Sequence, residues 1–377
     1  MVDARVGGAA VLAVLVLAGV GADGVAGTRP RWSAVPLAGA TAARDVLRCG
    51  DGWYLLGAYR GGPGVWRSTD GVTWRRTRTA PHTYYGHRQV LYAGGCHRGR
   101  IVAVGAQVGG AHGNPRTSSW YERADGTVVE VPGAVELYGG PRSVGVSRIA
   151  GGTTGSVVVG DWDGSSGRVG VAVWWSGDGR GFRRLPDDPA LAGVRGEQTT
   201  AADATATAGG WLVVGSRYVL DRPRLRREPV AWTSADGRHW RRDRIAASDG
   251  RQTLDRVVTT AYGVVAVGVD GSRFAAWRRD RRAWHRIGVF GSADGTSGVR
   301  SLAVLPGGGL VTTVPDAGRL ALWWSADGVD WARIPVPATV SAHGDTTLVT
   351  GATAGTLLVA AHDPHTTRLW YAPIPVS

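Results

Sequence analysis

Two sets of side chains in this 377-residue chain have the chemistry to cleave or bind a polar ligand. Glycoside hydrolysis needs two carboxyl groups in one site, and Glu197 and Asp255 are the candidate catalytic residues. Aromatic rings stack on sugars, and arginine holds carboxylates through paired hydrogen bonds. The candidate ligand-binding residues are Tyr84, Tyr85, Arg88, Tyr138, Arg142, Trp162, Arg256 and Arg300.

Several other chemistries are excluded by the motifs that are missing. The sequence has no lysine, which the phosphate-binding Walker loop requires, and no Gly-x-Ser-x-Gly, His-Glu-x-x-His or Cys-x-x-Cys. His362, Asp363 and His365 offer metal-ligand types, but a loop with two histidines is more often solvated. We therefore expect neither a metal nor a cofactor.

The elements that position these residues repeat along the chain. Short, strongly apolar segments ending in a small residue recur at intervals of 46 to 55 residues, which is the spacing of propeller blades. Each copy has a weakly apolar strand before this segment and an aromatic strand after it. The seven segments end at Gly57, Gly105, Gly160, Gly215, Gly268, Val314 and Ala361.

The two ends of the chain complement each other. The seventh copy lacks a fourth strand, and the segment Arg31 to Leu37 resembles the fourth strands of other copies. Pairing of this segment with the strand of Trp370 would close a ring and remove an exposed sheet edge. We predict an all-β fold, a seven-bladed β-propeller over residues 28–377 as one domain, with two separate sandwiches as the alternative.

The phrase Trp-x-Ser-x-Asp-Gly-x-x-aromatic occurs four times, once in each of four copies. A tight turn needs glycine where φ is positive, an aspartate that accepts hydrogen bonds from turn N–H groups, and an apolar anchor. These requirements predict a structural role. The residues are Ser68, Asp70, Gly71 and Trp74; Ser176, Asp178, Gly179 and Phe182; Ser234, Asp236, Gly237 and Trp240; and Ser325, Asp327, Gly328 and Trp331.

This phrase resembles the Asp-box, or bacterial neuraminidase repeat, of sialidases and other secreted propellers, although it is one residue shorter between Asp and the aromatic residue. The resemblance implies that the phrase lies on the face opposite the active site. The Arg-Ile-Pro motif that sialidases carry near their start occurs here only at Arg333 to Pro335, near the C-terminus. Seven blades also differ from the six of sialidases, which argues against sialidase activity.

The two cysteines occupy equivalent positions in adjacent copies. Cys49 and Cys96 each precede a second strand by the same short interval, and first strands of adjacent blades are neighbours around the channel. We predict a disulfide between them, with two buried free thiols as the alternative.

The N-terminus predicts export. Residues 1–26 contain Arg5, the apolar run Ala9 to Ala18 and small residues, which is typical of a cleaved signal peptide. An uncleaved anchor is the alternative. Arginine gives the chain a net charge of +13 and a pI near 10.7, which favours polyanions without specifying a nucleic acid.

These features leave two functional classes. The first is a secreted, monomeric, non-catalytic propeller that binds a glycan, an anionic cell-wall polymer or a protein through its loops. The second is an exo-α-sialidase-like glycoside hydrolase acting on the same face. We prefer the first, because the sequence signals the fold clearly and a catalytic set poorly.

Overall fold

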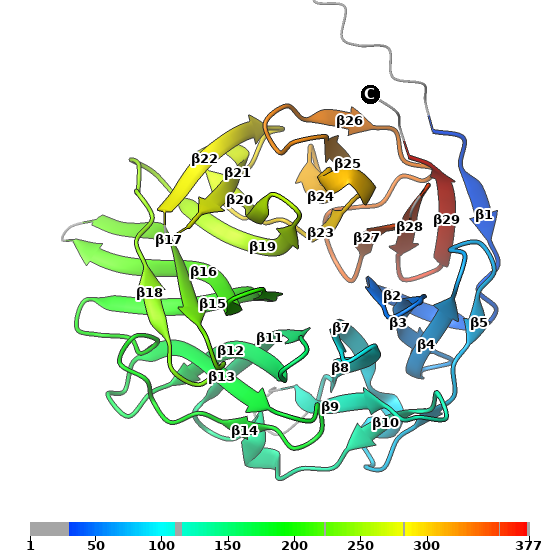
Figure 1. The fold of residues 1–377 in the computed structure, drawn as a ribbon, viewed down its shortest axis with the longest axis horizontal. Helices are drawn as coiled ribbons and strands as arrows, with labels where there is room; N and C mark the ends of the chain where they lie inside the picture. The colour runs from blue at the N-terminus through cyan, green and yellow to red at the C-terminus, as the bar shows by residue number, and fades with distance from the viewer. Residues whose placement is uncertain (1–29, 110–114, 222–223, 282, 354, 375–377) are drawn as a thin grey trace, which may run out of the picture.

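The computed structural model describes residues 30–109, 115–221, 224–281, 283–353 and 355–374. The predicted signal peptide, residues 1–26, lies outside these ranges. Figure 1 shows seven sheets arranged around a central axis. The predicted seven-bladed β-propeller is therefore confirmed, and the alternative of two sandwiches is excluded.

Each blade has four antiparallel strands from the channel to the rim, which follow chain order except in blade 7, whose rim strand comes from the start of the described chain. The first strands are β2 Ala40–Cys49, β7 Val90–His97, β11 Ser143–Gly151, β15 Glu197–Thr207, β19 Gln252–Thr260, β23 Ser301–Val304 and β27 Thr347–Ala352. The second strands are β3 Gly52–Tyr59, β8 Arg100–Gln107, β12 Ser156–Asp163, β16 Gly210–Asp221, β20 Gly263–Asp270, β24 Leu310–Asp316 and β28 Thr356–His362.

The outer half of each blade holds the aromatic strand and a short rim strand. The third strands are β4 Gly62–Ser68, β9 Arg116–Glu122, β13 Val169–Ser176, β17 Arg224–Ser234, β21 Arg273–Asp280, β25 Arg319–Ser325 and β29 Thr367–Pro373. The rim strands are β5 Arg75–Arg76, β10 Val128–Val131, β14 Arg183–Arg184, β18 Arg241–Asp243, β22 Ala283–Phe290, β26 Ala332–Ile334 and β1 Ser33–Val35.

The ring closes through β1, which completes blade 7 as predicted. β1 pairs antiparallel with β29, and Ala34 lies opposite Trp370. The indole Nε1 of Trp32 also donates to the carbonyl of Pro335, at 2.9 Å. The first and last parts of the described chain thus share one sheet, so blade 7 depends on both.

One strand was not predicted. β6 (Thr79–Ala80) pairs parallel with β10 and gives blade 2 a fifth strand. The chain leaving the rim of blade 1 runs along the outer edge of blade 2, where the Val128 N–H donates to the Arg78 carbonyl at 2.9 Å. This strand occupies an edge that would otherwise stay unpaired.

The small residue near the end of the second strands is explained by close backbone contact. A Cβ on Gly57, Gly215 or Gly268 would lie 1.9 Å from a carbonyl oxygen of the adjacent first strand. In these blades the first strand has a register shift beside that glycine, which brings its backbone inward. The repeated glycine therefore marks the bulge rather than the strand end.

The aspartate of the repeated phrase organises the turn between third and fourth strands. Asp70 Oδ1 accepts hydrogen bonds from the Ser68 hydroxyl at 2.8 Å and from the N–H groups of Val72 and Thr73 at 2.8 and 2.7 Å. These bonds hold the pKa of Asp70 well below its usual range. Asp178, Asp236 and Asp327 accept the corresponding three bonds.

The glycine and the aromatic residue of the phrase have distinct tasks. Gly71 has a φ of 76°, and its N–H donates to the Ser68 hydroxyl at 2.8 Å. Trp74 Nε1 donates to the Gly71 carbonyl at 2.9 Å. The same positive φ, from 73° to 83°, occurs at Gly179, Gly237 and Gly328.

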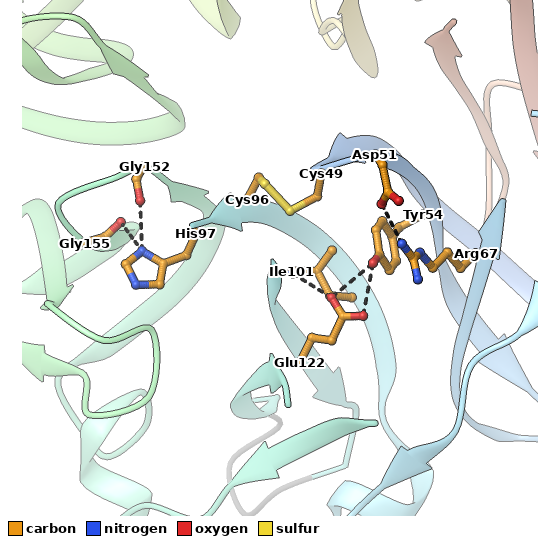
Figure 2. The surroundings of a disulfide bond; sticks show 10 residues. All are labelled: Cys49, Asp51, Tyr54, Arg67, Cys96, His97, Ile101, Glu122, Gly152 and Gly155. Carbon is orange, nitrogen blue, oxygen red and sulfur yellow. Dashed lines mark hydrogen bonds and ion pairs between the residues drawn. A yellow bond between two sulfur atoms is a disulfide. The ribbon is translucent and has the colours of Figure 1, made fainter. Parts of the chain in front are cut away.

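The predicted disulfide joins blades 1 and 2. Cys49 and Cys96 are bonded, with Cα atoms 5.1 Å apart, and Figure 2 shows them at the ends of their first strands. Behind the bond, the buried Tyr54 hydroxyl donates to Glu122 at 3.0 Å. The neighbouring His97 ring contacts two carbonyl oxygens of blade 3 through Nδ1, so adjacent links tie blades 1, 2 and 3.

Helical structure in the described ranges consists of short 3-10 turns: η1 Gly86–Arg88, η3 Val135–Leu137 and η4 Pro306–Gly308. None of the described helices is long and apolar enough to span a bilayer.

Candidate functional site

Antiparallel connections divide the ring into two faces. The loops from second to third strands, and from each blade to the next, lie at one end of the strands, which we call the loop face. The turns from first to second strands and the aspartate turns lie at the opposite end, the turn face. All candidate catalytic and ligand-binding residues are on the loop-face half of their blades, but they are not brought together.

A cavity on the loop face belongs to blade 2. It measures about 710 Å³, within the range of ligand pockets, and we call it the blade-2 groove. Its walls are the segment before η1, the start of β9, and the connection from β10 to β11 that contains η3. The described lining residues are Thr83, Tyr85, Pro115, Arg116, Thr117, Ser118, Val131, Gly133, Ala134, Val135, Leu137, Tyr138, Gly139, Gly140 and Pro141.

Glu130 underlies this groove and orders its polar wall. The buried carboxylate accepts hydrogen bonds from the His82 and Thr83 N–H groups at 2.7 and 2.8 Å. The Thr83 and Ser118 hydroxyls donate to its other oxygen at 2.7 and 2.8 Å. Burial by itself would raise the pKa of Glu130, but the four hydrogen bonds keep that pKa below its usual value. The Thr83 and Ser118 hydroxyls are thus already committed as donors.

Tyr85 and Arg116 form the aromatic and cationic part of the groove. The Arg116 guanidinium lies 5.4 Å from the centre of the Tyr85 ring. Tyr84, 65% exposed, packs edge-on against Tyr85 and bonds through its hydroxyl with Arg88 at 2.6 Å. The Arg88 guanidinium also lies 4.6 Å from the Tyr84 ring centre. Tyr84, Tyr85 and Arg88 therefore do cluster at one place.

Tyr138 and Trp162 are buried rather than exposed platforms. Tyr138 is 5% exposed and forms the inner groove wall, with its ring 5.4 Å from that of Trp174. Trp162 is 8% exposed, also packs against Trp174, and lies under Arg184. Arg142 donates to the Asp163 carbonyl at 2.7 Å. These residues support blade 3, and the Trp162 ring is too buried to serve as a ligand platform.

Glu197 is held in an ion-pair network within blade 4. Its oxygens lie 2.6 Å from Arg242 and 3.2 Å from Arg217, and Arg217 also contacts Glu228 at 2.5 Å. The Glu197 side chain is only 10% exposed. Both oxygens of Glu197 are thus engaged by guanidinium groups, which makes the residue part of a structural ion-pair network.

Asp255 and Arg256 lie at the channel instead. Asp255 Oδ2 accepts from the Val299 N–H of blade 6 at 3.0 Å, and Arg256 donates to the Arg300 and Asp255 carbonyls. Burial lowers the pKa of Arg256 to about 10, and the nearby Arg148 adds to this effect. Asp255 thus links blades 5 and 6 through this hydrogen bond.

Sequence reasoning missed the charged residues inside the channel. Arg148 lies between Asp45 and Asp203, 3.6 Å from an oxygen of each. Each aspartate also accepts an N–H of the next blade, Gly94 for Asp45 at 2.9 Å and Val257 for Asp203 at 3.1 Å. Asp45 and Asp203 both follow the first-strand bulge and so occupy equivalent positions in blades 1 and 4. This equivalence is the sequence signal that could have identified them.

The channel contains a second cavity, of about 610 Å³, on the turn-face side of these charges. All seven blades contribute to it. Its two carboxylates, Asp45 and Asp203, are thus each engaged by Arg148 and by an N–H of the next blade.

Asp161 is a half-buried carboxyl on the loop-face side. It accepts the Ala201 N–H at 2.7 Å, which links blade 3 to blade 4. Burial raises the pKa of Asp161 to about 7, against the effect of that hydrogen bond. The group therefore titrates near neutral pH.

The remaining candidates lie apart from the blade-2 groove. Arg300 lines a polar hollow of about 550 Å³ between blades 5, 6 and 7. His362 is buried and bonds to Thr367, and Asp363 accepts N–H groups of its own turn. Within the described ranges no three His, Cys, Asp or Glu side chains gather as a metal site would require.

The fold occurs in proteins of very different sequence. No family model and no curated protein matches the chain. YCF48 from Cyanidioschyzon merolae is 13% identical, with a TM-score of 0.52 over 91% of this chain and 98% of its own. YCF48 bound to D1 peptide is 15% identical, with a TM-score of 0.52 over 91% and 95%. Virginiamycin B lyase from Staphylococcus aureus is 8% identical, with a TM-score of 0.53 over 92% and 100%. Identities this low establish the propeller fold alone.

Proposed function

We propose that the protein is a non-catalytic binding scaffold of the Asp-box type that holds a segment of a partner protein in the blade-2 groove. One observation carries the proposal. The described lining of this groove has apolar, glycine and hydroxyl residues with one cation, Arg116, and no Asp, Glu, His or Cys. Such a lining binds a ligand but offers no carboxylate, imidazole or thiol for catalysis.

The shape and chemistry of the groove favour an extended peptide. The wall at Gly139 and Gly140 carries no side chains, so another backbone can approach it closely. Val135 and Leu137 offer apolar contact, and Arg116 offers a partner for an acidic side chain. The peptide-bound YCF48 structure supports the proposal, because a propeller of similar fold is described with a peptide.

Export belongs to the same proposal. The Cys49–Cys96 bond fits an oxidising compartment, and the segment 1–26 has the pattern of a signal peptide. We infer that the scaffold acts outside the cytoplasm, on the cell surface or in the medium.

A glycan ligand and a glycoside hydrolase are the competing functions. The exposed aromatic ring of Tyr84 is already stacked by Arg88, which reduces its use as a sugar platform. Glu197 is paired with two arginines, and Asp255 is bound to the backbone of blade 6. Neither residue is placed as the free member of a catalytic pair.

The test compares turnover with binding. The full chain is assayed on fluorogenic sialosides and neutral glycosides, on a glycan array and against a random peptide library. We expect no turnover, and peptide binding that is lost in Val135→Asp. Turnover that disappears in Glu197→Gln or Asp255→Asn would show that the protein is a glycoside hydrolase. Glycan binding without peptide binding would show that the ligand is a glycan and not a protein segment.

A further inference from the structure

Blade 4 extends beyond the other blades. Its strands β16 and β17 have 12 and 11 residues, whereas the second and third strands of the other blades have 7 or 8. Four additional residues at about 3.3 Å each carry the hairpin roughly 13 Å further. In Figure 1 this hairpin reaches the outer rim of the ring on the left.

The end of this extension presents aliphatic and cationic side chains together. Leu220 and Leu225 lie opposite each other and are 51% and 64% exposed. They are the only exposed leucines among the residues that the structure describes. The Leu220 N–H donates to the Gly196 carbonyl at 2.9 Å, so Val194, 51% exposed, lies in the adjoining loop. We call Val194, Arg195, Leu220, Arg224 and Leu225 the blade-4 tip; its arginines are also exposed.

Two glutamates are paired at the base of the extension. Glu228 is 3% exposed and contacts Arg217 and Arg226, and Glu197 contacts Arg217 and Arg242. Tyr218 lies under the Arg227 guanidinium, 5.1 Å away. This network makes the base rigid, because each of these charges is held by an opposite one. The described residues further out are Leu220, Leu225, Arg224 and one acidic residue, Asp221, which ends β16 opposite Arg224.

We propose that the blade-4 tip docks on an anionic phospholipid bilayer. Aliphatic side chains on a protrusion can enter the acyl region while flanking arginines remain at the phosphates. A stable protein partner would need about 1,000 Å² or more of complementary surface, and three aliphatic side chains on a narrow hairpin cannot provide it. The net charge of +13 adds long-range attraction to an anionic surface.

The test places a fluorescent reporter at the tip. The two native cysteines are bonded to each other, so an environment-sensitive dye can be attached at Leu225→Cys in the full chain. A label at Val329→Cys, 40% exposed in an aspartate turn of the turn face, is the matched control. Vesicles of phosphatidylcholine alone are compared with vesicles containing one-third phosphatidylglycerol, at low and high salt.

We expect the dye at position 225 to shift to the blue with anionic vesicles, more weakly with neutral vesicles or high salt, and the dye at 329 to stay unchanged. In unlabelled protein, Leu220→Ser with Leu225→Ser should lower the vesicle affinity by at least about tenfold, whereas Val72→Ser with Val329→Ser should not. Because the dye reports only its own position, binding through the apolar segment Ala9 to Ala18 cannot imitate the result.

A dye at 225 that remains in water when the protein is vesicle-bound would overturn the proposal. An equal shift with poly-glutamate and none with vesicles would also overturn it, in favour of an acidic protein partner. Neither result touches the blade-2 groove, so the two proposals can fail separately.

Discussion

At the scale of single residues, buried and half-buried carboxylates of this propeller order the backbone around them. Glu130 fixes the wall of the blade-2 groove through four hydrogen bonds. Asp45, Asp161, Asp203 and Asp255 each accept an N–H of the following blade. An aspartate on an inner strand can therefore look catalytic in sequence while serving to join blades.

Glu130→Gln should loosen the groove wall. The amide side chain can accept fewer of the four donors, so the cost in unfolding free energy is on the order of 1 to 3 kcal/mol. We also expect faster hydrogen exchange at His82 and Thr83, whose N–H groups lose their acceptor. Glu136→Gln, at an exposed residue of η3, is the control. Unchanged exchange at both amides would refute the assignment.

Asp161→Asn should alter the pH dependence of stability. The folded-state pKa of about 7 lies above the unfolded value near 3.8, so the unfolded chain loses its proton first and the wild type loses stability as pH rises from 4 to 7. The asparagine keeps an acceptor for Ala201 without ionising. We expect the stability of the variant relative to the wild type to rise over this window, by on the order of 1 to 3 kcal/mol, and then to level off. Urea unfolding of both proteins from pH 4 to 8 measures this stability difference, and a difference that does not change with pH would contradict the prediction.

At the scale of elements, the same turn is rebuilt in four blades by the same residues. Ser and Asp accept or donate within the turn, and glycine takes the positive φ. The turn lies on the turn face, away from the blade-2 groove, so its repetition reflects folding of the outer hairpin.

Asp236→Ala should cost about 1 to 2 kcal/mol. The carboxylate accepts from the Arg238 and His239 N–H groups at 2.8 and 2.9 Å, and both lose that partner. Thermal unfolding measures the change, with Asp249→Ala in an exposed loop as the control. If the variant lost ligand binding with its thermal stability intact, the turn would have a functional role instead.

The disulfide should stabilise the junction of blades 1 and 2. Cys49 and Cys96 are 47 residues apart, and the chain-entropy account gives roughly 4 kcal/mol for a closed loop of this size. We expect a clear loss of thermal stability in Cys49→Ser with Cys96→Ser, and a matching loss on adding reductant to the wild type. A reductant that lowers the stability of the double variant equally would show that the effect is not due to this bond.

At the scale of the whole molecule, the ring could be predicted and the site could not. The sequence shows seven copies of one pattern, a segment at Arg31–Leu37 that completes the seventh copy, and two cysteines at equivalent positions. All three features follow from a repeat, and repeats are visible in sequence. The environment of a loop residue depends on neighbours from other segments. Trp162 is buried under Arg184, and Glu197 is paired with Arg217 and Arg242.

The parts that break the repeat escaped prediction for the same reason. β6 adds to blade 2 in parallel, and Glu130 lies beneath a loop of the preceding connection. A single glutamate within the apolar run Val128–Val131 was the available signal. The long hairpin of blade 4 carries the blade-4 tip, so the two proposed contact surfaces arise where the blades differ.

The measurement that tests the central claim most directly is the affinity of one peptide for three proteins: the wild type, Val135→Asp in the blade-2 groove, and the control Tyr262→Ala. The peptide is first selected on the wild type from a random library. By calorimetric titration we expect Val135→Asp to weaken binding at least about tenfold, because a charge would face the apolar wall of the blade-2 groove. Tyr262→Ala, a change at another exposed residue, on the turn face, should leave the affinity equal to that of the wild type. Equal affinity for all three proteins would show that the blade-2 groove is not the binding site.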